Sequence, residues 1–177
     1  VTKGLWALDA KLAYKRHFPA INWLQSYTLY AATLEGWYGK EIAEDFASNR
    51  RRAQEILQDE SKLEEIVRLV GMDALSPKEQ LTMETARMIR EDFLFQNGFD
   101  PVDAYSSLQK QYRLLKSILT FADMAEPVIV QEDFEFKKLQ ELPVKEEIAQ
   151  ASFFPEEEVE ESFNKLDETI RSQISSL

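Results

Sequence analysis

One stretch of the sequence, residues 66–99, constrains the fold most, because it joins two helix boundaries to a long helical pattern. Gly71 is expected to end a first helix, since glycine adopts the left-handed cap conformation without a Cβ clash. Ser76 and Glu79 have the spacing of a capping box, and the proline between them suits the first position of a second helix. The residues of the following stripe recur at helical spacing: Thr82, Ala86, Ile89 and Phe93. Residues 77–95 are therefore predicted to form a stiff helical rod of roughly 28 Å, at ~1.5 Å per residue.

The composition limits the classes of function that this chain can serve. With 177 residues, 44% of them hydrophobic, the chain can build one domain, or one domain with an appendage. No apolar run reaches the ~20 residues that a membrane helix needs, and the lack of cysteine excludes disulfides, thiol catalysis and Cys-type zinc sites. The net charge of −11 is concentrated in residues 131–177, which carry 5 basic and 13 acidic side chains. A nucleic-acid partner is not expected, because this charge repels phosphate backbones. Direct membrane insertion is not expected either, because the sequence has no apolar run of sufficient length.

Helical patterns cover most of the chain and predict an all-α fold. Besides the rod, helices are expected over residues 10–17, 23–34, 40–58, 62–70, 101–126, 134–142, 143–152 and 155–177. Gly36 and Gly39 are expected to bracket a loop, and Pro127 to end a helix before a short extended run at residues 128–130. The last helix has an apolar stripe that must pack on this domain or on a partner: Val159, Phe163, Leu166, Ile170, Ile174 and Leu177.

The beginning of the chain reads as a β-strand. Residues 1–8 are rich in β-branched and aromatic side chains, yet nothing precedes them that could pair with them. The sequence also lacks an initiator methionine. We therefore interpret the chain as a piece of a longer protein, cut near a domain boundary.

No group of residues has the pattern of a catalytic or metal site, and neither kind of site is expected in this chain. His17 is the sole histidine, and its place beside basic residues at a helix end favours a structural role. The acidic clusters at 64–65, 91–92 and 156–158 follow neither a calcium-loop nor a Glu-x-x-His pattern, which favours solvated helix faces. Phosphate-loop, dinucleotide-binding and nucleophile-elbow motifs are also missing from the sequence.

Two aromatic loops do not fit a purely helical pattern. Phe18 precedes Pro19, and a residue before proline is pushed out of the helical region into an extended turn. Residues 95–99 place two aromatic rings and two side-chain amides on a second loop. Together the loops offer faces for stacking and amides for hydrogen bonding, as a purine base requires. The alternative is that both are packing aromatics at the edge of a domain.

Long segments resemble the catalytic A subunit (alpha chain) of V-type and archaeal A-type rotary ATP synthases: WALDAKLAY, RHFPAINWLQSYTLY and EILQDESKLEEIVRLVGMDALSPKEQLTMETARMIREDFLFQNGF. The resemblance covers nearly the whole chain. It implies the C-terminal helical bundle domain of that subunit, with one residual N-terminal β-strand from the preceding nucleotide-binding domain. Residues 1–21 would be the end of the nucleotide-binding domain and a hinge, residues 22–130 the bundle, and residues 131–177 an acidic helical extension.

The resemblance also implies a role in nucleotide binding. In the more distantly similar β subunit of F-type synthases, a tyrosine-proline step stacks on adenine, and the matching position here is Phe18. A Q-x-F segment of that subunit closes the same pocket, and its counterpart here, one residue longer, includes Gln96, Asn97 and Phe99. ATP or ADP with Mg²⁺ would be bound mainly by the upstream domain, which would carry the catalytic groups. This chain alone is therefore expected to be inactive.

A contact with a rotating shaft is implied as well. The F-type lever pattern I-x-x-x-G-x-D-x-L-S is matched over residues 67–76, with valine in place of isoleucine. The acidic turn that follows in that family is replaced by Pro77-Lys78-Glu79-Gln80, which is mixed in charge. A steric push by a stiff, well-capped turn is expected rather than a charge-driven contact. The residues implied at the shaft are Gly71, Asp73, Leu75, Ser76, Lys78 and Glu79.

The implied assembly is an alternating A3B3 hexamer with B subunits, around central shaft subunits, in the cytoplasm and peripheral to the membrane. ATP hydrolysis or synthesis would be coupled through this domain to shaft rotation and to transport of protons or sodium ions. The residues alone leave one alternative, a free-standing acidic helical adaptor without nucleotide binding. It would explain the charge and the terminal amphipathic helix, but not a strand at the first residue.

Overall fold

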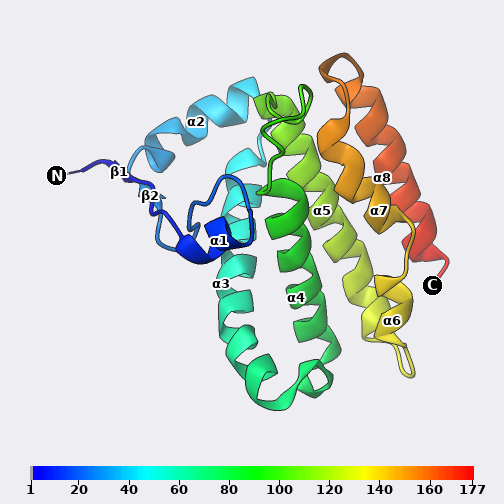
Figure 1. Cartoon of the computed structure of the whole chain (residues 1–177). Coiled ribbons are helices and arrows are strands. Elements are labelled where there is room, and N and C mark those ends of the chain that lie inside the picture. The colour runs from blue at the N-terminus through cyan, green and yellow to red at the C-terminus, as the bar shows by residue number, and fades with distance from the viewer. Residues whose placement is uncertain (1) are drawn as a thin grey trace.

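Four long helices lie side by side in the order α3, α4, α5 and α8, and shorter elements cover them (Figure 1). The structure, a computed structural model, describes residues 2–177. Helices α3 and α4 run antiparallel as a hairpin, and α5 packs against both of them and against α8. The bounds are Phe46–Val70 for α3, Pro77–Met88 for α4, Leu108–Ile129 for α5 and Val159–Ser175 for α8. The predicted all-α fold is confirmed.

The N-terminal strand has its partner later in the same chain. Gly4–Leu5 (β1) pairs antiparallel with Tyr27–Thr28 (β2), with Gly4 opposite Thr28 and Leu5 opposite Tyr27. The helix predicted over residues 23–34 is therefore wrong in its first half. Aromatic and β-branched residues favour a strand wherever a partner strand is within reach, and β1 supplies that partner.

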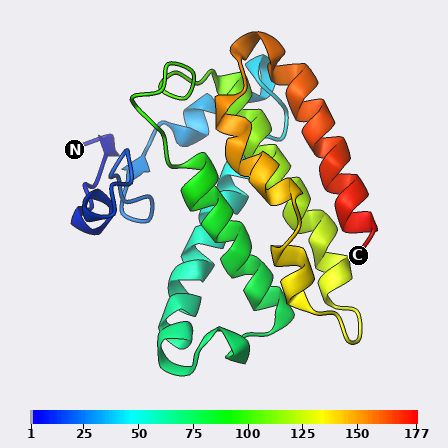
Figure 2. The same cartoon turned by 45° about the vertical axis from the view of Figure 1, so that its right-hand side comes forward.

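Side-chain caps organise the rest of this N-terminal segment, which we define as residues 2–30. Asp9 accepts hydrogen bonds from the backbone of Lys11 and Leu12 and begins α1 (Ala10–Tyr14), as predicted. The side chain of Asn22 accepts from two backbone amides and holds a turn where the sequence predicts a helix. In Figures 1 and 2 the segment stands to one side of the four long helices.

Helix α2 (Ala31–Glu41) runs through Gly36 and Gly39, where the sequence predicts a loop. Glycine inside a helix costs roughly 1 kcal/mol relative to alanine. Aromatic packing offsets this cost, since the ring of Tyr38 stacks on that of Phe46 with 4.4 Å between the centroids. The prediction of a loop is therefore wrong, because it rested on local propensity alone.

Helix α3 is a single helix where the sequence predicts two. The capping pattern at Ser61 lies inside it and begins no new helix. Leu57 and Leu63, on either side of the expected break, are both buried, and Glu60 between them is 5% exposed and forms an ion pair with Arg90. Burial of α3 against the neighbouring helices therefore continues past the capping pattern. This burial outweighs the local signal for a new helix start at Ser61.

The turn between α3 and α4 lies where it was predicted. Gly71 ends α3 with a positive φ of 89°, but its ψ of 167° lies outside the left-handed helical region that the prediction assumed. Ser76 and Glu79 form both halves of the capping box. Helix α4 continues into a π-helical turn, Ile89–Phe93 (η2), in which the amide of Leu94 donates to the carbonyl of Ile89 at 2.8 Å. The rod of the sequence analysis is thus continuous from Pro77, but it ends at Phe93 and its last turn is wider than an α-helix.

Helix α5 is displaced toward the C-terminus relative to the prediction. It begins at Leu108 because Asp100 accepts from the backbone amides of Val102 and Asp103 and holds a separate turn first. It runs through Pro127, and residues 128–129 are helical rather than extended. Burial of Ile129, which is 1% exposed, offsets the hydrogen bond that proline removes from the last turn.

The C-terminal part packs on α5. Helices α6 (Phe136–Gln140) and α7 (Val144–Gln150) and two short 3₁₀ turns lead into α8. The predicted apolar stripe of α8 is buried from Val159 to Ile174, whereas Leu177 is 37% exposed. Alongside this stripe, Arg113 of α5 forms ion pairs with Glu160 and Asp167 of α8.

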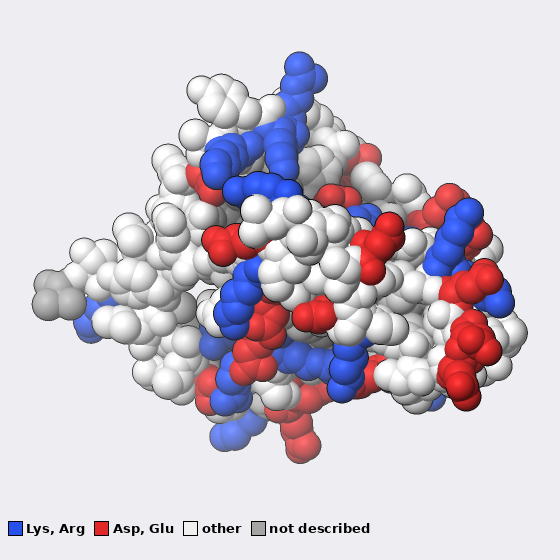
Figure 3. Space-filling view, turned by 90° about the horizontal axis from the view of Figure 1, so that it is seen from below, with Lys and Arg blue, Asp and Glu red and all other residues white. Residues whose placement is uncertain are grey.

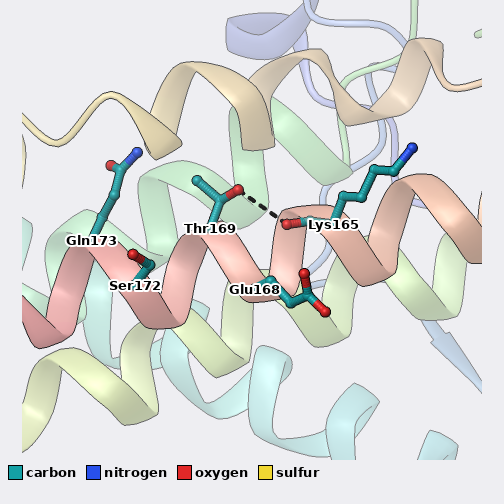
Figure 4. A pocket seen from close by; sticks show the side chains of 5 residues that line it. All are labelled: Lys165, Glu168, Thr169, Ser172 and Gln173. Carbon is teal, nitrogen blue, oxygen red and sulfur yellow. Dashed lines mark hydrogen bonds between the residues drawn. The ribbon is translucent and has the colours of Figure 1, made fainter.

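The outer side of α8 is polar. A hollow on it is lined by Lys165, Glu168, Thr169, Ser172 and Gln173 (Figure 4). Thr169 Oγ1 donates to the carbonyl of Lys165 at 3.0 Å, so this side chain is bound to its own helix. Gln173 accepts from the first amide of α7 at 2.9 Å. Across residues 2–177, none of the helices is both long enough and apolar enough to cross a membrane.

Candidate functional site

The structure brings Phe18 together with the loop that follows η2, which we call the 95–103 loop. The amide of Gln96 donates to the carbonyl of Phe18 at 2.7 Å. The ring of Phe18 lies against Gly98, because a Cβ added at Gly98 would be 3.4 Å from the ring carbon Cε1. Phe18 remains 55% exposed and Phe99 is fully exposed. Two exposed aromatic residues from distant parts of the sequence are thus brought together through Gln96 and Gly98. The 95–103 loop follows the upper end of the α4 rod in Figure 1.

His17 attaches the N-terminal segment to the π-helical turn. Its Nε2 lies 2.8 Å from the carbonyl of Arg90, and since a carbonyl can only accept, the ring nitrogen donates. The His17 ring also packs edge-on against Phe95, with 5.6 Å between centroids, and lies 5.8 Å from the ring of Trp23. These contacts give His17 a structural position next to Phe18.

The two side-chain amides serve the loop and also leave groups free for a ligand. Gln96 Nε2 donates to the carbonyl of Asp103 at 2.8 Å, and Asn97 Oδ1 accepts from the amide of Phe99 at 3.1 Å. Within residues 2–177, Gln96 Oε1 and Asn97 Nδ2 have no intramolecular hydrogen bond. One acceptor and one donor therefore remain, which is the combination that the Watson–Crick edge of adenine requires.

Behind this surface a cavity separates the N-terminal segment from the helices. Its volume is about 690 Å³, and its lining includes the aromatic rings of Trp23, Phe46, Phe93 and Tyr112. Phe95 and Gln96 line it as well, so it adjoins the 95–103 loop. The N-terminal segment is therefore held to the helices at a few points, with space between.

The opposite end of the hairpin is its tip, residues 69–79 (Figures 1 and 2). Of the residues expected at a shaft, Leu75 is buried and anchors the turn. Lys78 is paired with Glu126 at 2.6 Å, and Glu79 accepts from the amide of Ser76. These three side chains are thus engaged within the chain.

Apolar side chains that the sequence analysis did not single out are exposed at the tip. Leu69 is 82% exposed, Val70 63% and Met72 38%. The apolar run just before Gly71 is the sequence signal from which these exposed residues could have been predicted. From below, uncharged surface near the centre of the view is bordered by both basic and acidic side chains (Figure 3). The tip thus carries no single-sign charge.

Charged side chains fasten the middle of the hairpin to α7. Glu84 contacts Arg87 at 2.8 Å and Lys145 at 2.6 Å. Burial acts to raise the pKa of Glu84, but these two cations hold it below its ordinary value. Burial raises the pKa of Asp92, in the π-helical turn, to about 6. Among the described residues no three His, Asp or Glu side chains are grouped so that they could hold a metal ion.

The fold defines an all-α bundle domain with a capped helical hairpin and a pair of aromatic loops at one end. The sequence profile described as the C-terminal domain of V and A type ATP synthase matches residues 35–139. The V-type ATP synthase alpha chain of Acetivibrio thermocellus is 49% identical over 177 residues, which is 100% of this chain and 30% of that protein. Those of Clostridium novyi and Thermoanaerobacter pseudethanolicus are 47% and 45% identical, with the same coverage.

The chain belongs to this family of V- and A-type ATP synthase C-terminal domains. The resemblance found in the sequence is thereby confirmed, and the adaptor hypothesis is disfavoured. The chain spans 30% of the length of these relatives.

Proposed function

We propose that this chain is the lever of an ATP synthase alpha chain, closing over adenine at one end and pushing a central shaft at the other. The observation that carries the proposal is the continuity of α4 and η2 between the 95–103 loop and the tip. At ~1.5 Å per residue these elements span roughly 25 Å, and a capping box stabilises their lower end. A movement at the loop is therefore transmitted to the tip.

At the adenine end, Phe18 and Phe99 offer exposed rings for stacking, while Gln96 Oε1 and Asn97 Nδ2 offer an acceptor and a donor. The upstream domain binds most of the ATP or ADP with its Mg²⁺ and supplies the phosphate site and the catalytic groups, so that this chain alone hydrolyses no ATP. Nucleotide binding draws the bundle toward the upstream domain, and the hinge lies in residues 1–21.

At the tip, the exposed apolar residues next to Gly71, Asp73 and Ser76 press on the shaft sterically, which fits the mixed charge there. In this proposal three such chains alternate with three B subunits in a head on the cytoplasmic side of the membrane. Residues 22–130 act as the lever, and residues 131–177 brace it. Closure and opening couple ATP turnover to rotation and to transport of protons or sodium ions.

The test is Phe18→Ala in the full-length alpha chain. We expect ATP and ADP to bind about tenfold more weakly, or roughly 1.4 kcal/mol, because stacking on the base is lost. The matched control is Tyr14→Ala, which removes an exposed aromatic ring from the same segment. Nucleotide affinity is measured by fluorescence titration. Equal affinity in Phe18→Ala and the wild type would refute the stacking role.

A further inference from the structure

The π-helical turn at the end of the rod releases one backbone carbonyl. In an α-helix the amide of Leu94 would donate to the carbonyl of Arg90, but here it donates to that of Ile89 at 2.8 Å. The carbonyl of Arg90 instead accepts from Nε2 of His17 at 2.8 Å. A backbone carbonyl held away from water without a partner is costly, so the π-helical turn depends on this donor from outside the rod.

The two residues on either side of this hydrogen bond are held by further contacts. The guanidinium of Arg90 lies 3.2 Å from a carboxylate oxygen of Glu60, a buried residue of α3. The ring of His17 packs edge-on against that of Phe95, at the start of the 95–103 loop, with an angle of 72° between the ring planes. His17 therefore contacts both the π-helical turn and the loop that the turn leads into.

The attachment of the N-terminal segment to the rest of the molecule is concentrated at this point. Within residues 2–177, two hydrogen bonds join the segment to other parts of the chain beyond its connection into α2. They are the bond from His17 to Arg90 and the bond from the amide of Gln96 to the carbonyl of Phe18. The cavity of about 690 Å³ separates the segment from the helices nearby. A change at the His17 bond therefore acts directly on the place of Phe18 relative to the loop.

We propose that His17 is a positioning residue for nucleotide binding, which keeps the end of the rod π-helical and thereby sets the 95–103 loop against Phe18. This inference rests on the proposed function. Without the donor, the amide of Leu94 returns to the carbonyl of Arg90 and the turn becomes α-helical. A π-helical turn holds one residue more than an α-helical turn, so the chain after Leu94 shifts by one position. Phe99 then no longer faces the base on which Phe18 stacks.

His17→Leu in the full-length alpha chain tests this role, because leucine retains an apolar side chain but has no donor. In a structure of the assembled enzyme from electron microscopy, we expect the amide of Leu94 to donate to the carbonyl of Arg90. We expect KM for ATP to rise about fivefold with kcat changed less than twofold, since the base is misplaced while the catalytic groups are untouched. His17→Gln provides an amide donor of similar reach, and should retain the π-helical turn and keep KM within twofold of the wild type. A histidine that only filled space would affect the melting temperature and leave both the turn and KM unchanged.

The matched control is Trp23→Phe, which changes the packing beside the His17 ring but not its hydrogen bond, and should leave the turn and KM unaltered. If His17→Leu does not fold, His17→Asn provides the same readouts, because its shorter amide does not reach Arg90. A π-helical turn or an unchanged KM in His17→Leu, or in His17→Asn when the former is unfolded, overturns the inference.

The Phe18→Ala variant separates this result from failure of the proposed function. If Phe18→Ala weakens nucleotide binding while the His17 variants do not, the adenine site stands and the role of His17 is refuted. If Phe18→Ala also binds nucleotide as the wild type does, the adenine site itself is refuted, and the inference fails with it.

Discussion

The side chain of His17 links the N-terminal segment to the π-helical turn next to the candidate site. In the π-helical turn the amide of Leu94 donates to Ile89 instead of Arg90, and His17 donates to the carbonyl of Arg90. The sequence could indicate only that a lone histidine was structural. Its partner, 73 residues away, depends on how the N-terminal segment packs on η2.

Asp92 provides a pH-dependent prediction at the residue scale. Because burial raises its pKa to about 6, the folded state binds this proton more tightly than the unfolded state, and the ionised carboxyl destabilises the fold above pH 6. Asp92→Asn should therefore raise the free energy of unfolding at pH 7.5, by up to about 3 kcal/mol. The advantage should shrink as pH falls from 6 to 4, where the wild-type carboxyl becomes neutral.

The measurement is urea denaturation of both proteins across this pH range, with Glu55→Gln, at an exposed position on α3, as the control. Equal stability of Asp92→Asn and the wild type at pH 7.5 would contradict the argument.

At the scale of elements, replacing a glycine by alanine should change the free energy of unfolding in opposite directions at Gly71 and Gly36. Gly71 ends α3 with a φ of 89° and a ψ of 167°, a region that residues with a Cβ avoid, so Gly71→Ala should destabilise by about 1–3 kcal/mol. Gly36 lies inside α2, where an added Cβ meets nothing within 4 Å, so Gly36→Ala should stabilise by about 0.5–1 kcal/mol. Thermal unfolding of the two variants measures both effects. Shifts of the same sign would show that one of these backbone assignments is wrong.

At the scale of the whole molecule, a polar seam fixes α8 to α5. Arg113, 9% exposed, contacts Glu160, Asn164 and Asp167, and Ser117 donates to Asp167 at 2.6 Å. Arg113→Met should cost about 2–3 kcal/mol, because it leaves carboxylates at the seam without their cation.

Limited proteolysis checks this prediction, since a loosened α8 should be cleaved faster than the rest of the chain. Arg171→Met, at an exposed position on α8, should behave as the wild type. An Arg113→Met variant that resists protease as the wild type does would refute the importance of the seam.

The features that were predictable from sequence depend on neighbours within a few residues. The capping box at Ser76, the glycine end of α3, the Asp9 cap and the buried stripe of α8 are all confirmed. Each is governed by backbone hydrogen bonding or helical periodicity, which a short window of sequence contains. The pairing of the two aromatic loops lies outside such a window, and it was predicted from their complementary chemistry and from the family resemblance. The structure joins these loops through the amide of Gln96 and the carbonyl of Phe18.

Tertiary contacts decided the rest. The pairing of β1 with β2, the passage of α2 through two glycines and the unbroken α3 all go against local signals, because burial or a distant partner outweighs them. The burial of the Lys110 side chain, whose Nζ has no hydrogen-bond partner among the described residues, has no sequence pattern at all. This burial arises only after the helices have packed, and its energetic cost depends on the low dielectric that packing creates.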